Sequence, residues 1–168
     1  TVLGLKILTT LLSPDAYSEL ALLLGLAELC LGFFCGPLLQ SLLRFYPQAA
    51  KESEIPALRR LASRYLTRSV AAAAVFVLLV GSIWVARSNS LTTYATFVLV
   101  TAYFAVDVVR VFETNMLNAS RRQVECSVRS RADAWARPAA AVLVIVLLGP
   151  SPASVLAGYA VGSVLVTV

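Results

Sequence analysis

The chain has 168 residues, of which 59% are hydrophobic and 14% charged, with a formal net charge of +5 and a mean hydropathy of +0.82. This composition is too apolar for an ordinary soluble domain and favours a membrane protein. The chain contains no histidine, which excludes Ser-His-Asp triads, Cys-His pairs and His-rich zinc sites. We therefore expect neither an enzyme nor a cofactor.

Six apolar segments follow one another along the chain. A bilayer core of about 30 Å needs roughly 20 helical residues, so the longer segments can cross it as single helices. The chain starts without Met and the last segment runs to Val168, so we expect a piece of a longer protein with truncated first and last spans. The sequence predicts an all-α helical bundle of about six transmembrane helices, formed as one unit by residues 1–168, with spans near 2–12, 19–43, 69–86, 91–112, 136–148 and 153–168.

The second span, 19–43, carries two further features. Cys30 and Cys35 lie five residues apart, about 140° around an α-helix, which predicts neither a disulfide nor a metal site. Gly36 and Pro37 mark a candidate kink.

Basic residues concentrate in two connecting segments. Segments 44–68 and 118–137 hold eleven of the fourteen Lys and Arg residues. Cytoplasmic loops carry such an excess, so we expect both segments in the cytoplasm and the short turns outside. The positive charge is then explained by topology, and we expect no nucleic-acid partner.

The segment 44–68 is expected to lie at the membrane surface. Arg60, Arg64 and Arg68 recur every four residues on one face of a predicted interfacial helix, where they would meet anionic lipids. Earlier in the segment, Arg44 and the two following aromatics suit the headgroup region, and Pro47 is expected to end the helix.

Charged residues inside spans are the strongest functional signal. Glu28 lies in the second span, and Asp107, Arg110 and Glu113 share one side of the fourth, with Asn118 at its end. A structural interpretation is a paired ladder of Asp107, Arg110 and Glu113 buried against neighbouring helices. A functional interpretation is the wall of a water-filled cavity in which Arg110 attracts an anionic group. The sequence leaves both open.

Small residues in the last segment predict close helix packing. Gly158 and Gly162 form a G-x-x-x-G pair, which allows two helix backbones to approach.

Four stretches occur in an order typical of one transporter family: "LLSPDAYSELALL", "LLQSLLRFYPQAA", "YATFVLVTAYFAVDVVRVFETNMLNASRRQ" and "ADAWARP". With them, the chain resembles the N-terminal half of bacterial polysaccharide flippases, the O-antigen and exopolysaccharide transporters of the multidrug/oligosaccharidyl-lipid/polysaccharide exporter superfamily. The resemblance implies twelve to fourteen helices in two bundles around a central cavity in the bacterial cytoplasmic membrane.

The resemblance also implies a substrate, undecaprenyl-pyrophosphate-linked oligosaccharide, flipped to the outer leaflet for surface polysaccharide synthesis. Arg110 would meet the pyrophosphate, Arg44 would edge the cytoplasmic entrance, and Glu28 and Asp107 would serve ion coupling. A polysaccharide polymerase or export machinery would be a partner. The sequence offers no second clearly buried arginine for the cavity.

Other functions fit the same pattern of spans. One is another exporter of the superfamily, either a cation-coupled drug antiporter or a peptidoglycan-precursor flippase. Another is a membrane scaffold subunit without transport activity.

Overall fold

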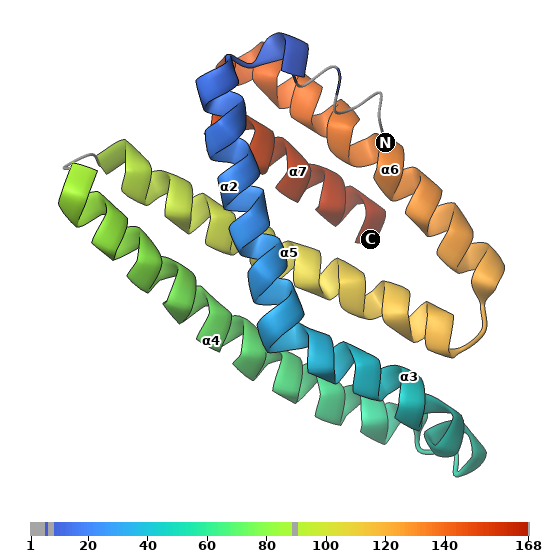
Figure 1. The fold of residues 1–168 in the computed structure, drawn as a ribbon. Coiled ribbons are helices and arrows are strands. Elements are labelled where there is room, and N and C mark those ends of the chain that lie inside the picture. Colours follow the sequence, from blue (N-terminus) through green and yellow to red (C-terminus); the bar gives the residue numbers. More distant parts are fainter. Residues whose placement is uncertain (1–5, 7–8, 89–90, 168) are drawn as a thin grey trace.

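The chain folds into an all-α bundle. The structure, a computed structural model, describes residue 6 and residues 9–88 and 91–167. Every regular element in these ranges is helical, which confirms the all-α prediction. The elements in chain order are α2 (Pro14–Cys30), a π-helical turn η1 (Leu31–Cys35), α3 (Gly36–Lys51), α4 (Ile55–Ser88), α5 (Leu91–Ala119), α6 (Gln123–Leu148) and α7 (Pro152–Thr167) (Figure 1).

Three stretches are long and apolar enough to cross a membrane: Pro14–Lys51, Ile55–Ala86 and Tyr94–Ala119. The apolar part of α7, Pro152–Val166, is shorter. The first predicted span lies largely outside the described residues. The count of six spans therefore stays a prediction.

The first long stretch is one bent helix. It begins at Pro14, where the backbone N–H of Ala16 donates to the capping hydroxyl of Ser13 over 3.3 Å. Its axis changes direction near η1, between α2 and α3 (Figure 1). Pro37 follows this turn, and a proline ring would clash with the carbonyl four residues back in a regular α-helix. The wider π turn at Leu31–Cys35 accommodates it, at the kink position that the sequence predicts.

Two expectations for the connecting segments were wrong. Pro47 does not end its helix, because α3 continues to Lys51. The helix predicted at 55–68 is present as the first part of α4, which runs without interruption from Ile55 to Ser88. Most of segment 118–137 is helix rather than loop, since α6 starts at Gln123. Arginine is a good helix former, so basic composition does not by itself indicate a loop.

Short turns therefore join the helices at both ends of the bundle. Ser53 between α3 and α4 and Arg121 between α5 and α6 both adopt φ 59°, and Gly149 before α7 adopts φ 92°. The first two turns lie toward one end of the bundle and the third toward the other (Figure 1). These first two turns belong to the basic segments 44–68 and 118–137. Both basic segments therefore include a turn at the same end of the bundle.

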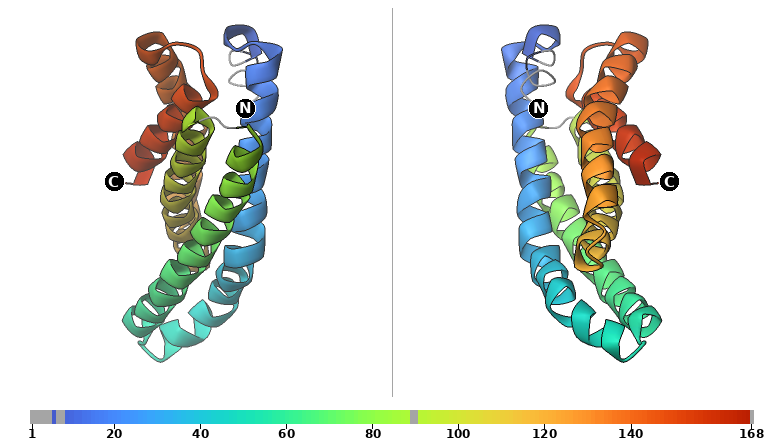
Figure 2. Two further views of the ribbon diagram at one scale, coloured as in Figure 1. Left: turned by 90° about the vertical axis from the view of Figure 1, so that its left-hand side faces the viewer. Right: turned by 90° about the vertical axis from the view of Figure 1, so that its right-hand side faces the viewer.

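Helix α5 is the centre of the bundle. It packs against α2, α3, α4, α6 and α7, and Phe104, Val100 and Val108 on it are buried in the hydrophobic core. The side views show α2 and α3 on one flank, α6 and α7 on the other and α5 between them (Figure 2). Side chains from both flanks can therefore meet on α5.

The closest packing joins α6 and α7. A Cβ atom added to Gly158 would lie 2.4 Å from the Cα of Ala141, and one added to Gly162 would lie 2.7 Å from the Cα of Arg137. Only glycine allows so close an approach, so the structure confirms the G-x-x-x-G packing surface. This contact fixes α6 beside α7 and so sets the position of Arg137.

Candidate functional site

Four charged side chains form a closed ring between α5 and α6. Arg110 donates from Nε to Asp107 Oδ1 over 2.8 Å and from Nη1 to Asp133 Oδ2 over 2.9 Å. Arg137 Nη2 donates to the same Asp107 Oδ1 over 2.9 Å, and its Nη1 lies 3.8 Å from Asp133 Oδ2. Two positive and two negative charges thus alternate around the ring, which is neutral overall. We call these four residues the charge ring.

Helical spacing explains why these residues meet. Asp107 and Arg110 are three apart on α5, and Asp133 and Arg137 are four apart on α6, so each pair lies on one face of its helix. The short turn at residues 120–122 reverses the chain between α5 and α6. The two faces are therefore brought together.

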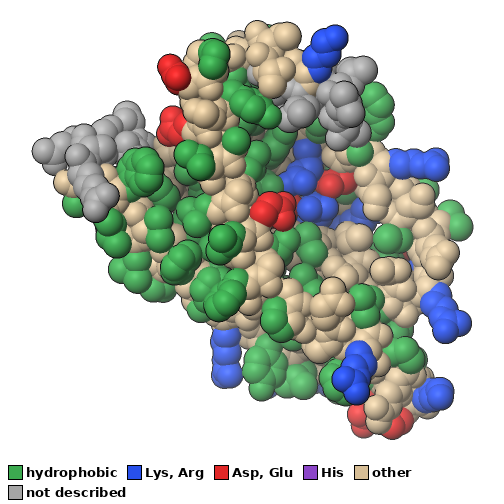
Figure 3. All heavy atoms as spheres, viewed as in Figure 1, with side chains coloured by type: hydrophobic (Ala, Val, Ile, Leu, Met, Phe, Trp, Pro, Cys, Tyr) green, Lys and Arg blue, Asp and Glu red, His purple; other side chains and the backbone are tan. Residues whose placement is uncertain are grey.

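The ring members differ in how deeply they are buried. The Asp107 side chain is 6% exposed, whereas those of Arg110, Asp133 and Arg137 are 15–18% exposed. Asp107 is thus the inner member, and the other three are reachable from outside. The space-filling view shows blue and red side chains meeting in the middle of the face between α2 and α6, surrounded by hydrophobic and neutral atoms (Figure 3).

Two tyrosines complete the surroundings of Arg137. Its guanidinium carbon lies 5.6 Å from the ring centroid of Tyr103 on α5 and 5.4 Å from that of Tyr159 on α7. Arg137 Nη2 also donates to the Tyr103 hydroxyl. Cation–π contacts of this kind stabilise an arginine where water is scarce. Arg137 is therefore held in place from three helices.

The hydrogen bonding of the ring is incomplete. Asp133 Oδ1 and Arg137 Nε are buried atoms without a hydrogen-bond partner among the described residues. A buried carboxylate oxygen or guanidinium N–H without a partner is unfavourable, so each has bonding capacity that a ligand or water can use. Both atoms belong to the α6 side of the ring.

The structure changes the predicted ladder on α5. Asp107 and Arg110 pair as expected, but Glu113 does not extend the ladder. It instead pairs with Arg59 near the start of α4. Glu113 lies six residues beyond Asp107, about 120° away around the helix, so it faces a different neighbour.

The sequence indicates no second clearly buried arginine, but the structure contains a second arginine that is shielded about as much as Arg110. Arg137 is that arginine, and its side chain is 18% exposed. From the sequence alone, Arg137 is the last residue of the basic segment 118–137. The signal that points to it is the i, i+4 spacing of Asp133 and Arg137 directly before an apolar run.

The other predicted site residues lie at separate positions. Glu28 is exposed on α2. Arg44 is exposed on α3 with its guanidinium 5.9 Å from the Phe45 ring. Asn118 is exposed near the end of α5, where its carbonyl accepts from the Arg121 N–H over 3.0 Å. The structure records no contact of Arg44 or Asn118 with the ring among the described residues.

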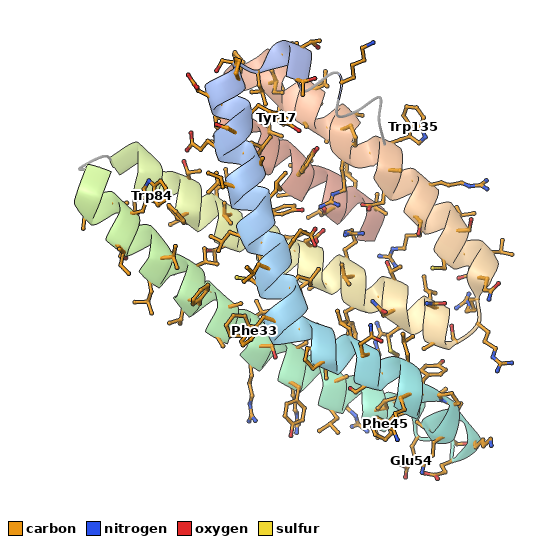
Figure 4. The ribbon with its side chains drawn as sticks, viewed as in Figure 1. Tyr17, Phe33, Phe45, Glu54, Trp84 and Trp135 are labelled. Atoms are coloured by element: carbon orange, nitrogen blue, oxygen red, sulfur yellow. The ribbon has the colours of Figure 1, made fainter. Side chains whose placement is uncertain are left out.

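The large exposed aromatics lie away from the ring. Phe33 at the bend of η1, Trp84 near the end of α4 and Trp135 on α6 are all more than half exposed, and their side chains lie at separate places around the bundle (Figure 4). Such amphipathic or apolar side chains suit a lipid environment. In the described part of the chain, no group of His, Cys, Asp and Glu side chains is arranged to hold a metal ion.

Comparison of the chain with models of known families, with curated proteins and with solved structures finds no match. Two guanidinium groups beside each other, with free N–H capacity on Arg137, form a site that can bind a phosphate or carboxylate group.

Proposed function

We propose that this chain is the N-terminal half of a bacterial inner-membrane flippase for undecaprenyl-pyrophosphate-linked oligosaccharide. The observation that carries the proposal is that Arg110 and Arg137 both contact the Asp107 carboxylate inside an apolar helical bundle. Ionisable residues at membrane depth are costly, so they are rare there and typically mark a substrate or ion path. Arginine binds phosphate through strong, charge-assisted hydrogen bonds, and the ring supplies two arginines.

The position of the ring along α5 supports this proposal. Asp107 and Arg110 lie within the stretch Tyr94–Ala119, which is long and apolar enough to span a membrane. Arg110 is nine residues from the end of α5, roughly 14 Å along the helix axis. In a bilayer core of about 30 Å, the ring is then close to the midplane, where transporters commonly bind their substrates.

The proposed orientation places the α3–α4 and α5–α6 turns in the cytoplasm. Most of the basic residues lie in the two segments that contain these turns, and positive residues are retained on the cytoplasmic side. Ser53→Cys and Arg121→Cys in a cysteine-free parent protein should react with a membrane-impermeant thiol reagent from the cytoplasmic side, and Gly149→Cys from the outside. Labelling of all three from one side would contradict the orientation.

Complementation tests the proposed function. The parent full-length protein is expressed in a strain that lacks its own oligosaccharide flippase, and surface polysaccharide is measured. We expect the wild type to restore polysaccharide, and Arg110→Ala and Arg137→Ala to abolish it. Arg131→Ala is the matched control because Arg131 is exposed on the same helix as Arg137, and it should behave as wild type.

The other outcomes separate the alternatives. Restoration by Arg110→Ala and Arg137→Ala at matched membrane abundance would make the ring purely structural. Failure of the abundant wild type to restore polysaccharide would count against this substrate. A drug antiporter, a peptidoglycan-precursor flippase or a scaffold subunit would then be the better interpretation.

A further inference from the structure

We propose that Asp133 is a built-in competitor for the anionic substrate: its carboxylate occupies the pair formed by Arg110 and Arg137, and an incoming pyrophosphate must displace it. This inference builds on the proposed function, because it assigns the self-occupied anion site through which the substrate would bind.

The two aspartates of the ring are held very differently. One oxygen of Asp107 accepts hydrogen bonds from both arginines, at 2.8 and 2.9 Å. Asp133 has one short contact, 2.9 Å to Arg110, and one long contact, 3.8 Å to Arg137. Its second oxygen has no partner among the described residues. Asp133 is therefore the more weakly held carboxylate.

The two aspartates also differ in accessibility. The side chain of Asp107 is 6% exposed and that of Asp133 is 15% exposed. Asp107 lies at the inner side of both arginines and can remain there as their fixed counter-ion. Of the two carboxylates, that of Asp133 is the one more accessible to an anion from outside.

The charges explain why displacement is needed. With both aspartates in place the ring is neutral, so it offers an anion little net attraction. When the Asp133 carboxylate moves away, the two arginines and Asp107 leave one net positive charge and freed guanidinium N–H groups. A phosphate oxygen can then accept the hydrogen bond from Arg110 Nη1 that Asp133 Oδ2 has accepted.

The surrounding groups support a role for Asp133 itself rather than for net charge alone. Asp133 contacts Arg110 on α5 and Arg137 on its own helix. The Arg137 guanidinium is held in turn by contacts with the rings of Tyr103 and Tyr159. These contacts keep the arginine pair assembled when Asp133 leaves. The anion can thus replace the Asp133 carboxylate while Arg110 and Arg137 stay in place.

Binding of inorganic pyrophosphate to the purified full-length parent protein tests the inference. Isothermal titration calorimetry in detergent is run on the wild type, Asp133→Asn and Arg110→Ala. Asparagine has the shape of aspartate without its charge, so it no longer competes as an anion. We expect Asp133→Asn to bind pyrophosphate about tenfold more tightly than the wild type, and Arg110→Ala to bind none.

Three further variants separate competition from other effects. Asp133→Glu keeps a carboxylate and should bind no more tightly than the wild type. Asp15→Asn removes an exposed acid at the start of α2 and is the control for net charge. Asp107→Asn removes the fixed counter-ion, and its gain in pyrophosphate affinity should be smaller than that of Asp133→Asn because the arginines lose the group that orients them.

Parallel titrations with inorganic phosphate and farnesyl pyrophosphate distinguish a free anion from a lipid diphosphate as the ligand.

The outcomes distinguish this inference from the proposed function. If wild type and Asp133→Asn bind pyrophosphate equally and Arg110→Ala does not bind, the anion site exists but Asp133 is not a competitor. Weaker binding by Asp133→Asn would likewise overturn the inference and make Asp133 a residue that orients the arginines. If no variant binds any of the three anions, the site itself is absent and the proposed function fails with it.

Discussion

Arg137 on α6 donates a hydrogen bond of 2.9 Å to Asp107 on α5, although thirty residues separate them. The acceptor is the carboxylate oxygen that also accepts from Arg110. A single buried oxygen thus fixes two arginines from two helices. Any change to one partner therefore affects the other two.

Removal of Arg137 is expected to destabilise the bundle strongly. Arg137→Ala leaves Asp107 and Asp133 short of positive charge, and breaking a buried ion pair in this way costs about 3 to 5 kcal/mol. The free energy of unfolding is measured by titration with sodium dodecyl sulfate in mixed micelles. Arg131→Ala is the control and should change it by less than about 0.5 kcal/mol.

A double variant tests whether the loss comes from the pair. Arg137→Ala with Asp107→Ala should destabilise less than the sum of the two single variants, because the second change removes the uncompensated charge. Strict additivity would show that the two residues contribute independently.

Some of this arrangement is predictable from the sequence. The apolar composition and segment lengths predict the helices, and the i, i+3 spacing predicts the pair of Asp107 and Arg110. The kink before Pro37 follows from proline stereochemistry, and the close packing of Gly158 follows from the G-x-x-x-G pattern. These features all depend on residues near each other in the chain.

The rest depends on how distant helices pack. Arg137 reaches Asp107 because α6 lies against both α5 and α7, and the spacing within α6 does not reveal that contact. Glu113 faces α4 rather than the ring for the same reason. Basic composition was misleading for segment 118–137, which is mostly helix rather than loop because α6 begins at Gln123.

The contact between α6 and α7 predicts a strong effect at Gly158. A Cβ at this position would lie 2.4 Å from the Cα of Ala141 and 2.7 Å from its backbone nitrogen. Because backbone atoms cannot move aside like a flexible side chain, Gly158→Ala should force the helices apart and cost about 1 to 3 kcal/mol. Unfolding in mixed micelles again provides the measurement.

Gly25 offers a matched control on another helix. A Cβ added there meets nothing within 4 Å, and alanine is the better helix former. Gly25→Ala should therefore stabilise the protein by about 0.5 to 1 kcal/mol. Equal effects of the two alanine variants would count against the close packing of α6 on α7.

The ion pair between Arg59 on α4 and Glu113 on α5 is expected to contribute little. Their side chains are 56% and 28% exposed, and solvent screens such a pair. A double-mutant cycle with Arg59→Ala and Glu113→Ala should give a coupling free energy of about 0.2 to 1 kcal/mol, decreasing as salt is added. A coupling several times larger would indicate that this end of the bundle is shielded from water.

The proline inside α3 provides the final prediction. Pro47 lies four residues before Lys51, the last residue of α3, and it can donate no backbone hydrogen bond to Leu43 four residues earlier. Alanine restores that bond and removes the steric conflict with the Leu43 carbonyl. Since proline costs about 3 kcal/mol in a helix interior, Pro47→Ala should raise the free energy of unfolding by up to that amount. Pro56→Ala is the control, because Pro56 lies in the first turn of α4, where proline is tolerated. A stabilisation by Pro47→Ala no larger than that by Pro56→Ala would show that the last turn of α3 contributes little to the fold.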